Sequence, residues 1–299
     1  MKQYIMTAAG MLFFSLFCGA ALADTLVVGS INSNIKKETA RFAPLASYLS
    51  AKLKNAGVSK TEIKVLPTSE AMSTAMMSGD VDLFIDSPLT AARVVRSAGA
   101  VPLLRRWKDG VSEYHSVIMT LADSPLKDLT DLNGKLVAFQ HADSSSGFVI
   151  PAAHLKQAGL SLLKMENARD DIPDGRTGFV FSGSDKYSVA LLSKGWVDAA
   201  GTDNETFDEV NQDNPGKFRV LSTSVSVPRH VVLHAADMKP ELVTKIHAVL
   251  MEAETLPEGQ EMLEDFDDTV KFDPFPGGME ATFEPIYEIL DSATSIEGM

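Results

Sequence analysis

Cysteine is nearly absent from this chain of 299 residues, since Cys18 is the only one. It falls within residues 1–23, where a basic residue near the start, an apolar run and an Ala-Leu-Ala ending predict a secretory signal peptide cleaved after Ala23. Phe17 stands directly before Cys18, where a lipoprotein signal would have a small residue, so we expect a released protein. The mature chain then has no cysteine, which excludes structural disulfides.

Basic residues and long apolar runs are scarce as well. The sequence has 27 lysines and arginines against 40 aspartates and glutamates, a formal net charge of -13. Nucleic acids and anionic membrane surfaces bind through basic patches, so we expect neither as a partner. Beyond residue 23, no run approaches the ~20 apolar residues that span a bilayer. The mature protein is therefore expected outside the cytoplasm.

What the sequence does contain is a repeated succession of apolar, strand-like runs and amphipathic helical stretches. Strands are expected at residues 25–30, 63–66, 81–85, 136–139, 178–181 and 197–201, and helices at residues 37–53, 69–78, 88–97, 184–193 and in the stretch after residue 146. Such alternation predicts parallel sheets with helices on both faces and ligands beyond the carboxyl ends of the strands. Because the mature chain exceeds a usual domain of roughly 100–150 residues, we predict two α/β lobes.

The lobe limits follow from two segments in which the chain is expected to change lobes. A long strand at residues 113–121 leads toward the second lobe, and a strand at residues 218–224 returns the chain to the first. We therefore assign residues 24–118 and 222–299 to lobe 1 and residues 119–221 to lobe 2. Three later helices are expected to pack back on lobe 1, at residues 239–254, 258–266 and 279–289.

Three consecutive serines, Ser144, Ser145 and Ser146, separate the strand at residues 136–139 from the next helix. Together with Asp143 they are good N-cap residues. The free N–H groups at a helix start carry about half a positive charge, and with three hydroxyls they form a site for an oxyanion. The same pattern also fits an ordinary capped helix without a ligand.

A second helix start is predicted at Asp86-Ser87-Pro88, directly after the strand at residues 81–85. Proline is favoured at the first helical position, and serine before it is a good cap. Because the carboxyl ends of parallel strands lie at one edge of a sheet, this helix start is expected to face ligand in the same way. Simple capping is the alternative here too.

Several short motifs occur in a characteristic order. They are Arg41-Phe-Ala-Pro-Leu-Ala-Ser-Tyr-Leu-Ser, Gly79-Asp-Val-Asp-Leu, Tyr114-His-Ser, Asp131-Leu-Asn-Gly-Lys, Ser144-Ser-Ser-Gly-Phe and Gly195-Trp-Val-Asp-Ala. From Leu26 to about Leu250, the chain resembles the phosphate/phosphite/phosphonate-binding proteins of ABC importers. The resemblance implies an α/β, two-lobed type II periplasmic binding protein fold with crossover hinge strands. It also implies a solute-binding component that is no enzyme, uses no cofactor and delivers its ligand to a membrane permease.

The resemblance further implies which residues hold the ligand. In the family, hydroxyls and backbone N–H groups of the serine-rich block hold the phosphonate oxygens, which here means Ser144, Ser145 and Ser146. The tyrosine before the crossover helps, and here it is Tyr114. This assignment agrees with the oxyanion site expected from the helix start alone.

Two departures from the family pattern add carboxylates. Asp86-Ser87-Pro88 stands where the family has Gly-Pro with a tyrosine nearby, and Ser184-Asp185-Lys186 stands where it has Ser-His-Asp. A carboxylate ~4 Å from a bound dianion repels it by a few kcal/mol at an effective dielectric near 20. We therefore expect a zwitterion such as an aminoalkylphosphonate, with Asp86, Asp185 or Asp203 facing the ammonium. A solvated or capping role for each acid, and drift to a ligand without phosphorus, remain alternatives.

Other functions fit parts of the sequence. A hydrolase would use the serine run with His141 and Asp143, but no Gly-x-Ser-x-Gly elbow is present, and neighbours in sequence do not form a triad. A metal-importer protein would use His230 and His234, but no third ligand occurs at metal-binding spacing. A sensor that docks on a membrane receptor would have the same fold as an importer component, and the sequence does not separate the two.

Overall fold

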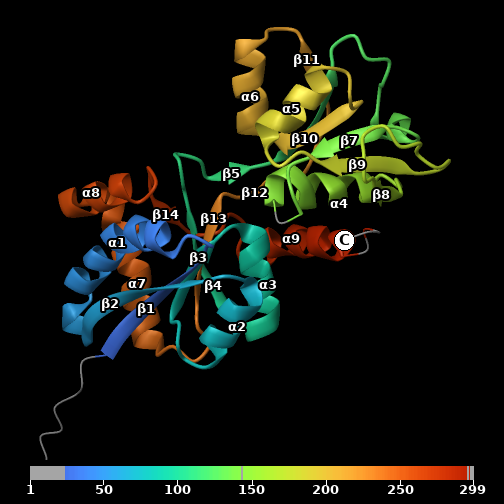
Figure 1. The fold of residues 1–299 in the computed structure, drawn as a ribbon. Coiled ribbons are helices and arrows are strands. Elements are labelled where there is room, and N and C mark those ends of the chain that lie inside the picture. Colours follow the sequence, from blue (N-terminus) through green and yellow to red (C-terminus); the bar gives the residue numbers. More distant parts are fainter. Residues whose placement is uncertain (1–23, 143, 295, 297–299) are drawn as a thin grey trace, which may run out of the picture.

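The computed structural model describes residues 24–142, 144–294 and 296. The predicted signal peptide, its cleavage site after Ala23 and the predicted cap residue Asp143 lie outside the described residues. Figure 1 shows two α/β units joined by a narrow connection, each built around one six-stranded sheet. We call them lobe 1 and lobe 2.

The sheet of lobe 1 has the order β14-β4-β13-β3-β1-β2. Its strands are β1 (Asp24–Ile31), β2 (Val58–Leu66), β3 (Leu83–Asp86), β4 (Val101–Arg106), β13 (His230–His234) and β14 (Phe272–Asp273). β1 runs parallel to β2 and β3, whereas β13 is antiparallel to β3 and β4. Leu83, Phe84 and Ile85 are all buried, because helices cover both faces of the sheet.

Five helices belong to lobe 1. They are α1 (Ile35–Lys52), α2 (Ser69–Met77), α3 (Pro88–Ala98), α7 (Pro240–Glu252) and α8 (Pro257–Asp265), with 3-10 turns at Lys54–Ala56 and Ala253–Thr255. α1 packs against α7 and α8, and Phe42, Leu49, Ile246 and Phe266 share their hydrophobic core. α2 and α3 pack together and contribute to a second core.

The sheet of lobe 2 has the order β11-β6-β10-β7-β9-β8. Its strands are β6 (Ser116–Leu121), β7 (Leu136–Phe139), β8 (Leu162–Lys164), β9 (Thr177–Phe181), β10 (Ala199–Asp203) and β11 (Phe218–Thr223). Its helices are α4 (Ile150–Gln157), α5 (Asp185–Ser193) and α6 (Asn204–Asp213), with a 3-10 turn at Leu129–Leu132. β7, β9 and β10 are parallel, as the strand–helix alternation predicted.

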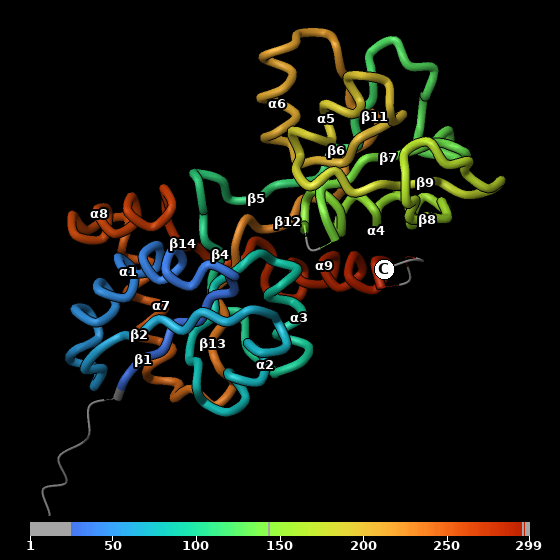
Figure 2. The backbone as a smooth tube through the Cα atoms, viewed as in Figure 1, coloured from blue at the N-terminus to red at the C-terminus, as the bar shows by residue number. Residues whose placement is uncertain are grey.

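The two chain crossings between the lobes differ from the prediction. The expected strand at residues 113–121 is two strands, β5 (Glu113–Tyr114) and β6, and β5 pairs with β12 (Val227–Pro228) in a small ribbon between the lobes (Figure 2). The predicted lobe limits, 118/119 and 221/222, fall inside β6 and β11, which both belong to the sheet of lobe 2. The extended, apolar pattern continues through the crossing, so the sequence gives no sign of where the chain changes sheets.

The last helix, α9 (Met279–Ala293), was expected on lobe 1 alone. In the structure it packs against α3 of lobe 1 and also against α4 of lobe 2, and Figures 1 and 2 show it between the lobes. Its buried residues Phe283, Ile286 and Ile289 belong to one core with side chains of both lobes. Within residues 24–142 and 144–294, no helix is long and apolar enough to cross a membrane.

Candidate functional site

The serine run lies at the carboxyl end of β7, where the chain enters a helix. Ser144 caps this helix by accepting a hydrogen bond from the Gly147 N–H at 3.0 Å, and its side chain is 8% exposed. The first turn, Ser145–Val149, is a π-helix that continues into α4, a feature that the expected α-helix did not include. Such π turns occur often at functional sites. The N–H groups of Ser145 and Ser146 precede the first helical hydrogen bond and therefore have no acceptor within the helix.

Contacts within lobe 2 hold the start of this helix in place. The hydroxyl of Ser116, the first residue of β6, donates to the carbonyl oxygen of Ser146 at 2.8 Å. Phe148 is fully buried and packs edge to face against Phe139 and Phe181. These contacts anchor the backbone of the turn, while the side chains of Ser145 and Ser146 stay partly exposed.

Ser145 is the point where the two lobes and the connection between them meet. Its Oγ lies 3.5 Å from Oγ of Ser87, the residue directly before α3 in lobe 1. Tyr114, in β5, lies near the same serine, whose hydroxyl lowers the pKa of the phenol to a small extent. Tyr114 is buried, and burial raises the pKa of its phenol, so the hydroxyl keeps its proton at neutral pH.

On the other side of the serine run lie two carboxylates of lobe 2. Oδ2 of Asp203 is 3.4 Å from Oγ of Ser146, while its Oδ1 caps α6 by accepting from the Thr206 N–H at 2.7 Å. Oδ2 of Asp185 accepts from Nε2 of Gln140 at 2.6 Å. Burial, and next to it the charge of Asp203, raise the pKa of Asp185. Asp203 thus has one oxygen committed to structure and one facing Ser146.

Ser184 has a different place from the other predicted residues. Its hydroxyl accepts a hydrogen bond from the Tyr187 N–H at 3.2 Å, which caps α5. Among the described residues, it forms no hydrogen bond with the serine run. We therefore define the interlobe cluster without it, as Asp86, Ser87, Tyr114, Ser145, Ser146, Asp185 and Asp203.

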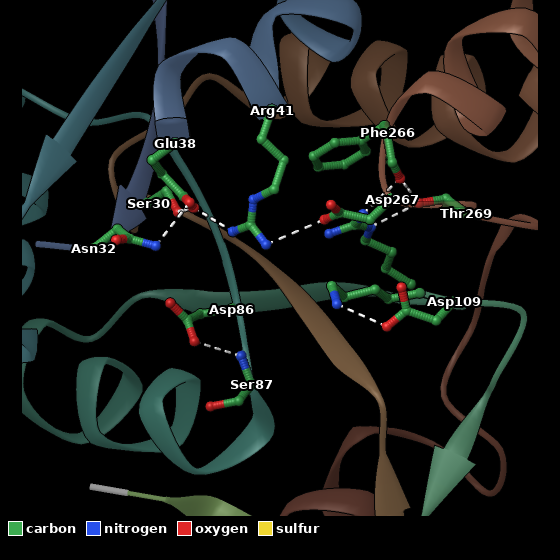
Figure 3. A network of polar contacts seen from close by, with 12 residues as sticks. Ser30, Asn32, Glu38, Arg41, Asp86, Ser87, Asp109, Phe266, Asp267 and Thr269 are labelled. Atoms are coloured by element: carbon green, nitrogen blue, oxygen red, sulfur yellow. Dashed lines mark hydrogen bonds and ion pairs between the residues drawn. The ribbon is translucent and has the colours of Figure 1, made fainter. Parts of the chain in front are cut away.

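The lobe 1 side of the cluster is formed by Asp86 and by two residues that the sequence analysis missed. Asp86 ends β3, and its Oδ1 accepts from the Ser87 N–H at 2.6 Å. Behind it, the almost fully buried Glu38 accepts hydrogen bonds from Ser30 and Arg41. Figure 3 shows this network above Asp86 and Ser87. The i, i+3 spacing of Glu38 and Arg41 predicts an ion pair on one helix face. Such pairs are common on exposed helix faces, so the spacing did not indicate a buried pair near the site.

Two carboxyl groups, those of Asp86 and Glu38, lie on the lobe 1 side of the cluster. Arg41 is the cation that acts on Asp86, but its guanidinium is paired with Glu38 and lies 3.2 Å from Asp267. Burial raises the pKa of Asp86 to about 6, with Glu38 raising it and Arg41 lowering it to a smaller extent. The cluster therefore combines hydroxyls and helix N–H groups with an excess of carboxyl groups. In the part of the chain that the structure describes, no three potential ligands converge on a metal position.

Comparison with known proteins shows which family the chain belongs to. A family model described as the periplasmic substrate-binding protein of phosphonate ABC transporters matches residues 32–275. The chain belongs to this family. It is therefore the substrate-binding component of a transporter and not an enzyme, and the predicted two-lobed type II fold is confirmed.

Two curated relatives of the phosphonate-binding family and one solved structure illustrate the likeness. A probable ABC transporter phosphite-binding protein, PhnD1 of Prochlorococcus marinus, is 23% identical over 78% of this chain and 76% of its own length. The phosphate-import protein PhnD of Mycolicibacterium smegmatis is 26% identical over 75% and 70%. The structure of XAC2383 from Xanthomonas citri bound to ATP is 25% identical, covers 91% of this chain and 99% of its own, and has a TM-score of 0.79.

Proposed function

We propose that this protein binds a small ligand with a tetrahedral phosphorus oxyanion at the interlobe cluster and presents it to the permease of an ABC importer. The observation that carries the proposal is the approach of the Ser145 and Ser87 hydroxyls to 3.5 Å. Because they come from different lobes, one oxyanion can contact both. The family description and the names of the relatives support this ligand class, since phosphonate, phosphite, phosphate and ATP all carry phosphorus oxyanions.

Within this class, we propose a zwitterion such as an aminoalkylphosphonate. Ser145 and Ser146 hold the oxyanion, Tyr114 donates to it, and Asp203 with Asp185 accepts from the ammonium. Oδ2 of Asp203, 3.4 Å from Ser146, supports this polarity because a carboxylate there would repel an anion that had no cation of its own. Asp86 was expected to serve the ammonium as well, but it lies on the Ser87 side of the cluster.

Transport follows from closure of the lobes. A ligand that contacts both lobes stabilises the closed state by its differential affinity for that state. The β5–β12 ribbon lies where such a motion has to bend the chain. The signal peptide cleaved after Ala23, the monomeric state and the absence of nucleic acid partners belong to this proposal too.

The double variant Ser145→Ala/Ser146→Ala tests the oxyanion anchor. Each lost hydrogen bond to a charged ligand should weaken binding by about 1–3 kcal/mol, measured by calorimetric titration with methylphosphonate and 2-aminoethylphosphonate. Folding should be nearly intact, because the helix cap is Ser144 and not either mutated residue. Ser69→Ala, on the surface of lobe 1, serves as the matched control. Unchanged affinity in the double variant would remove the anchor assignment.

A further inference from the structure

Asp86 is placed so that an anion at Ser145 has to meet it. It is the last residue of β3, and the next residue, Ser87, is the one that approaches Ser145 across the lobes. Tyr114 lies near both residues, since the Ser145 hydroxyl lowers and the Asp86 charge raises the pKa of its phenol. An oxyanion held by Ser145 is therefore bound beside the Asp86 carboxyl.

No cation neutralises this carboxyl. Among the residues that the structure describes, Asp86 forms no ion pair, and Arg41, which attracts it from farther away, is bonded to Glu38 and Asp267. The Ser87 N–H, at 2.6 Å, and the Ser87 hydroxyl stabilise the ionised carboxyl, but both are neutral donors. An ionised Asp86 next to an oxyanion would be repelled without compensation.

The other titratable groups around Asp86 do not change this balance. They are Glu38 and Arg41 from α1, His230 from β13, Tyr114 from β5 and Asp203 from lobe 2 across the cluster. Arg229 lies 5.5 Å from the centre of the Tyr114 ring, but its guanidinium is paired with Asp109 at 2.9 Å. His230 is buried in a cationic neighbourhood that lowers its pKa well below the usual value, so it is neutral at pH 7 and above. Glu38 and Asp203 add negative charge.

We propose that Asp86 binds the ligand as a neutral carboxylic acid that donates its proton to an oxygen of the oxyanion. The complex then holds one proton between the Asp86 carboxyl and the oxyanion, whether it arrives on the protein or on the ligand. This proposal rests on the proposed function and goes beyond it, because Asp86 then binds the oxyanion of the ligand and not its ammonium group. A hydrogen bond from an acid to an anion is short and strong, so it turns the repulsion into an attraction.

The pKa of Asp86 supports this role, because burial has already raised it to about 6 in the free protein. Protonation near neutral pH is therefore easy, and a bound anion raises the pKa further. The sign of the pH effect follows from the proton count. Where both the free Asp86 and the ligand are ionised, binding takes up one proton, and the affinity should fall tenfold for each unit by which the pH rises.

Calorimetric titration with methylphosphonate at about pH 9 and about pH 10, where the ligand is almost entirely a dianion, tests the proposal. The wild-type protein should lose tenfold in affinity over this unit and take up one proton, counted by repeating the titration in buffers of different ionisation enthalpy. Asp86→Asn, whose amide donates at any pH, should show no such loss. Asp80→Asn, at an exposed aspartate of lobe 1, should keep the wild-type slope.

The possible outcomes distinguish a failure of the Asp86 proposal from a failure of the proposed function. Wild-type binding without proton uptake, or an Asp86→Asn variant with the wild-type slope, would overturn the role of Asp86 and leave the proposed function in place. A wild-type protein that binds neither methylphosphonate, 2-aminoethylphosphonate nor phosphate would overturn both. The proton count uses the unmodified protein, so an absence of proton uptake overturns the role of Asp86 even if the variant does not fold, and the Asp86→Asn slope assigns an observed uptake to Asp86.

Discussion

Neighbouring serines in this chain have different tasks. Ser144 closes the helix start and is almost buried, whereas Ser145 and Ser146 keep partly exposed hydroxyls that reach Ser87 and Asp203. All three were predicted as equal ligand residues, because sequence position does not say which hydroxyl turns back to the backbone. The serine run could be found from its place after an apolar strand, but the division of labour within it is set by backbone geometry.

Gly147 lies where the serine run passes close to Gln140 and Asp185. A Cβ at this position would lie 2.6 Å from Cβ of Gln140 and 2.8 Å from Oδ1 of Asp185. Gly147→Ala should therefore displace Asp185 and weaken ligand binding, and overpacking of this kind destabilises a protein by about 1–3 kcal/mol. Calorimetry and thermal unfolding measure the two effects.

The control for this variant is Gly178→Ala. Its Cβ would be similarly crowded, 2.9 Å from Cδ1 of Ile172, but away from the interlobe cluster. It should lose stability and keep its affinity. Equal affinities in the two variants would show that Gly147 has no special role at the site.

At the scale of the elements, Arg106 attaches the chain after α8 to the sheet of lobe 1. This arginine of β4 is fully buried, and its guanidinium donates to Oγ1 of Thr269 at 2.9 Å and to the Phe266 carbonyl at 2.7 Å. It also lies 3.1 Å from Oδ2 of Asp267 and 3.6 Å above the Phe266 ring. Burial lowers its pKa to about 10, so it stays charged at neutral pH.

Arg106→Leu should lower the free energy of unfolding by about 3–5 kcal/mol, because it removes a fully buried guanidinium, its hydrogen bonds to Thr269 and the Phe266 carbonyl, and one of the two cations beside Asp267. Chemical denaturation measures this loss. Arg96→Leu is the matched control, since Arg96 forms a two-pronged but exposed ion pair with Asp291 and should lose only about 0–1 kcal/mol. Similar losses in both variants would contradict the anchoring role of Arg106.

Most elements could be predicted from periodicity. The strand at residues 136–139 and the α5 region were predicted almost to the residue, because apolar runs and caps mark their limits. The π turn at Ser145–Val149 and the break at His115 could not be predicted, since each depends on how the chain is bonded to distant strands. Glu38 and Arg41 were missed for the same reason, because their burial depends on tertiary packing.

At the scale of the whole molecule, α9 ties the lobes together. Leu89 of α3, Ala153 of α4 and Ile286 of α9 are all buried in one hydrophobic core. The amphipathic pattern of α9 could predict a helix with one apolar face, but not that the face covers both lobes. Closure on a ligand therefore has to take place while α9 keeps its contacts or exchanges them.

This shared core should make the two lobes unfold as one unit. Differential scanning calorimetry of the ligand-free protein should give a single transition whose calorimetric and van't Hoff enthalpies agree. Ile286→Ala should shift that transition to lower temperature by removing about 2–5 kcal/mol of packing. Two resolved transitions in the unmodified protein would contradict the coupling of the lobes through α9.

The most direct test of the central claim is a thermal-shift measurement on refolded, ligand-stripped protein. The ligands are phosphate, phosphite, methylphosphonate, 2-aminoethylphosphonate, sulfate and glycine betaine. A ligand that binds only the native state stabilises it by roughly 2.7 kcal/mol at a hundredfold excess over its dissociation constant. The account predicts shifts with the phosphorus oxyanions, the largest with 2-aminoethylphosphonate. A shift with sulfate or glycine betaine and none with any phosphorus compound would contradict it.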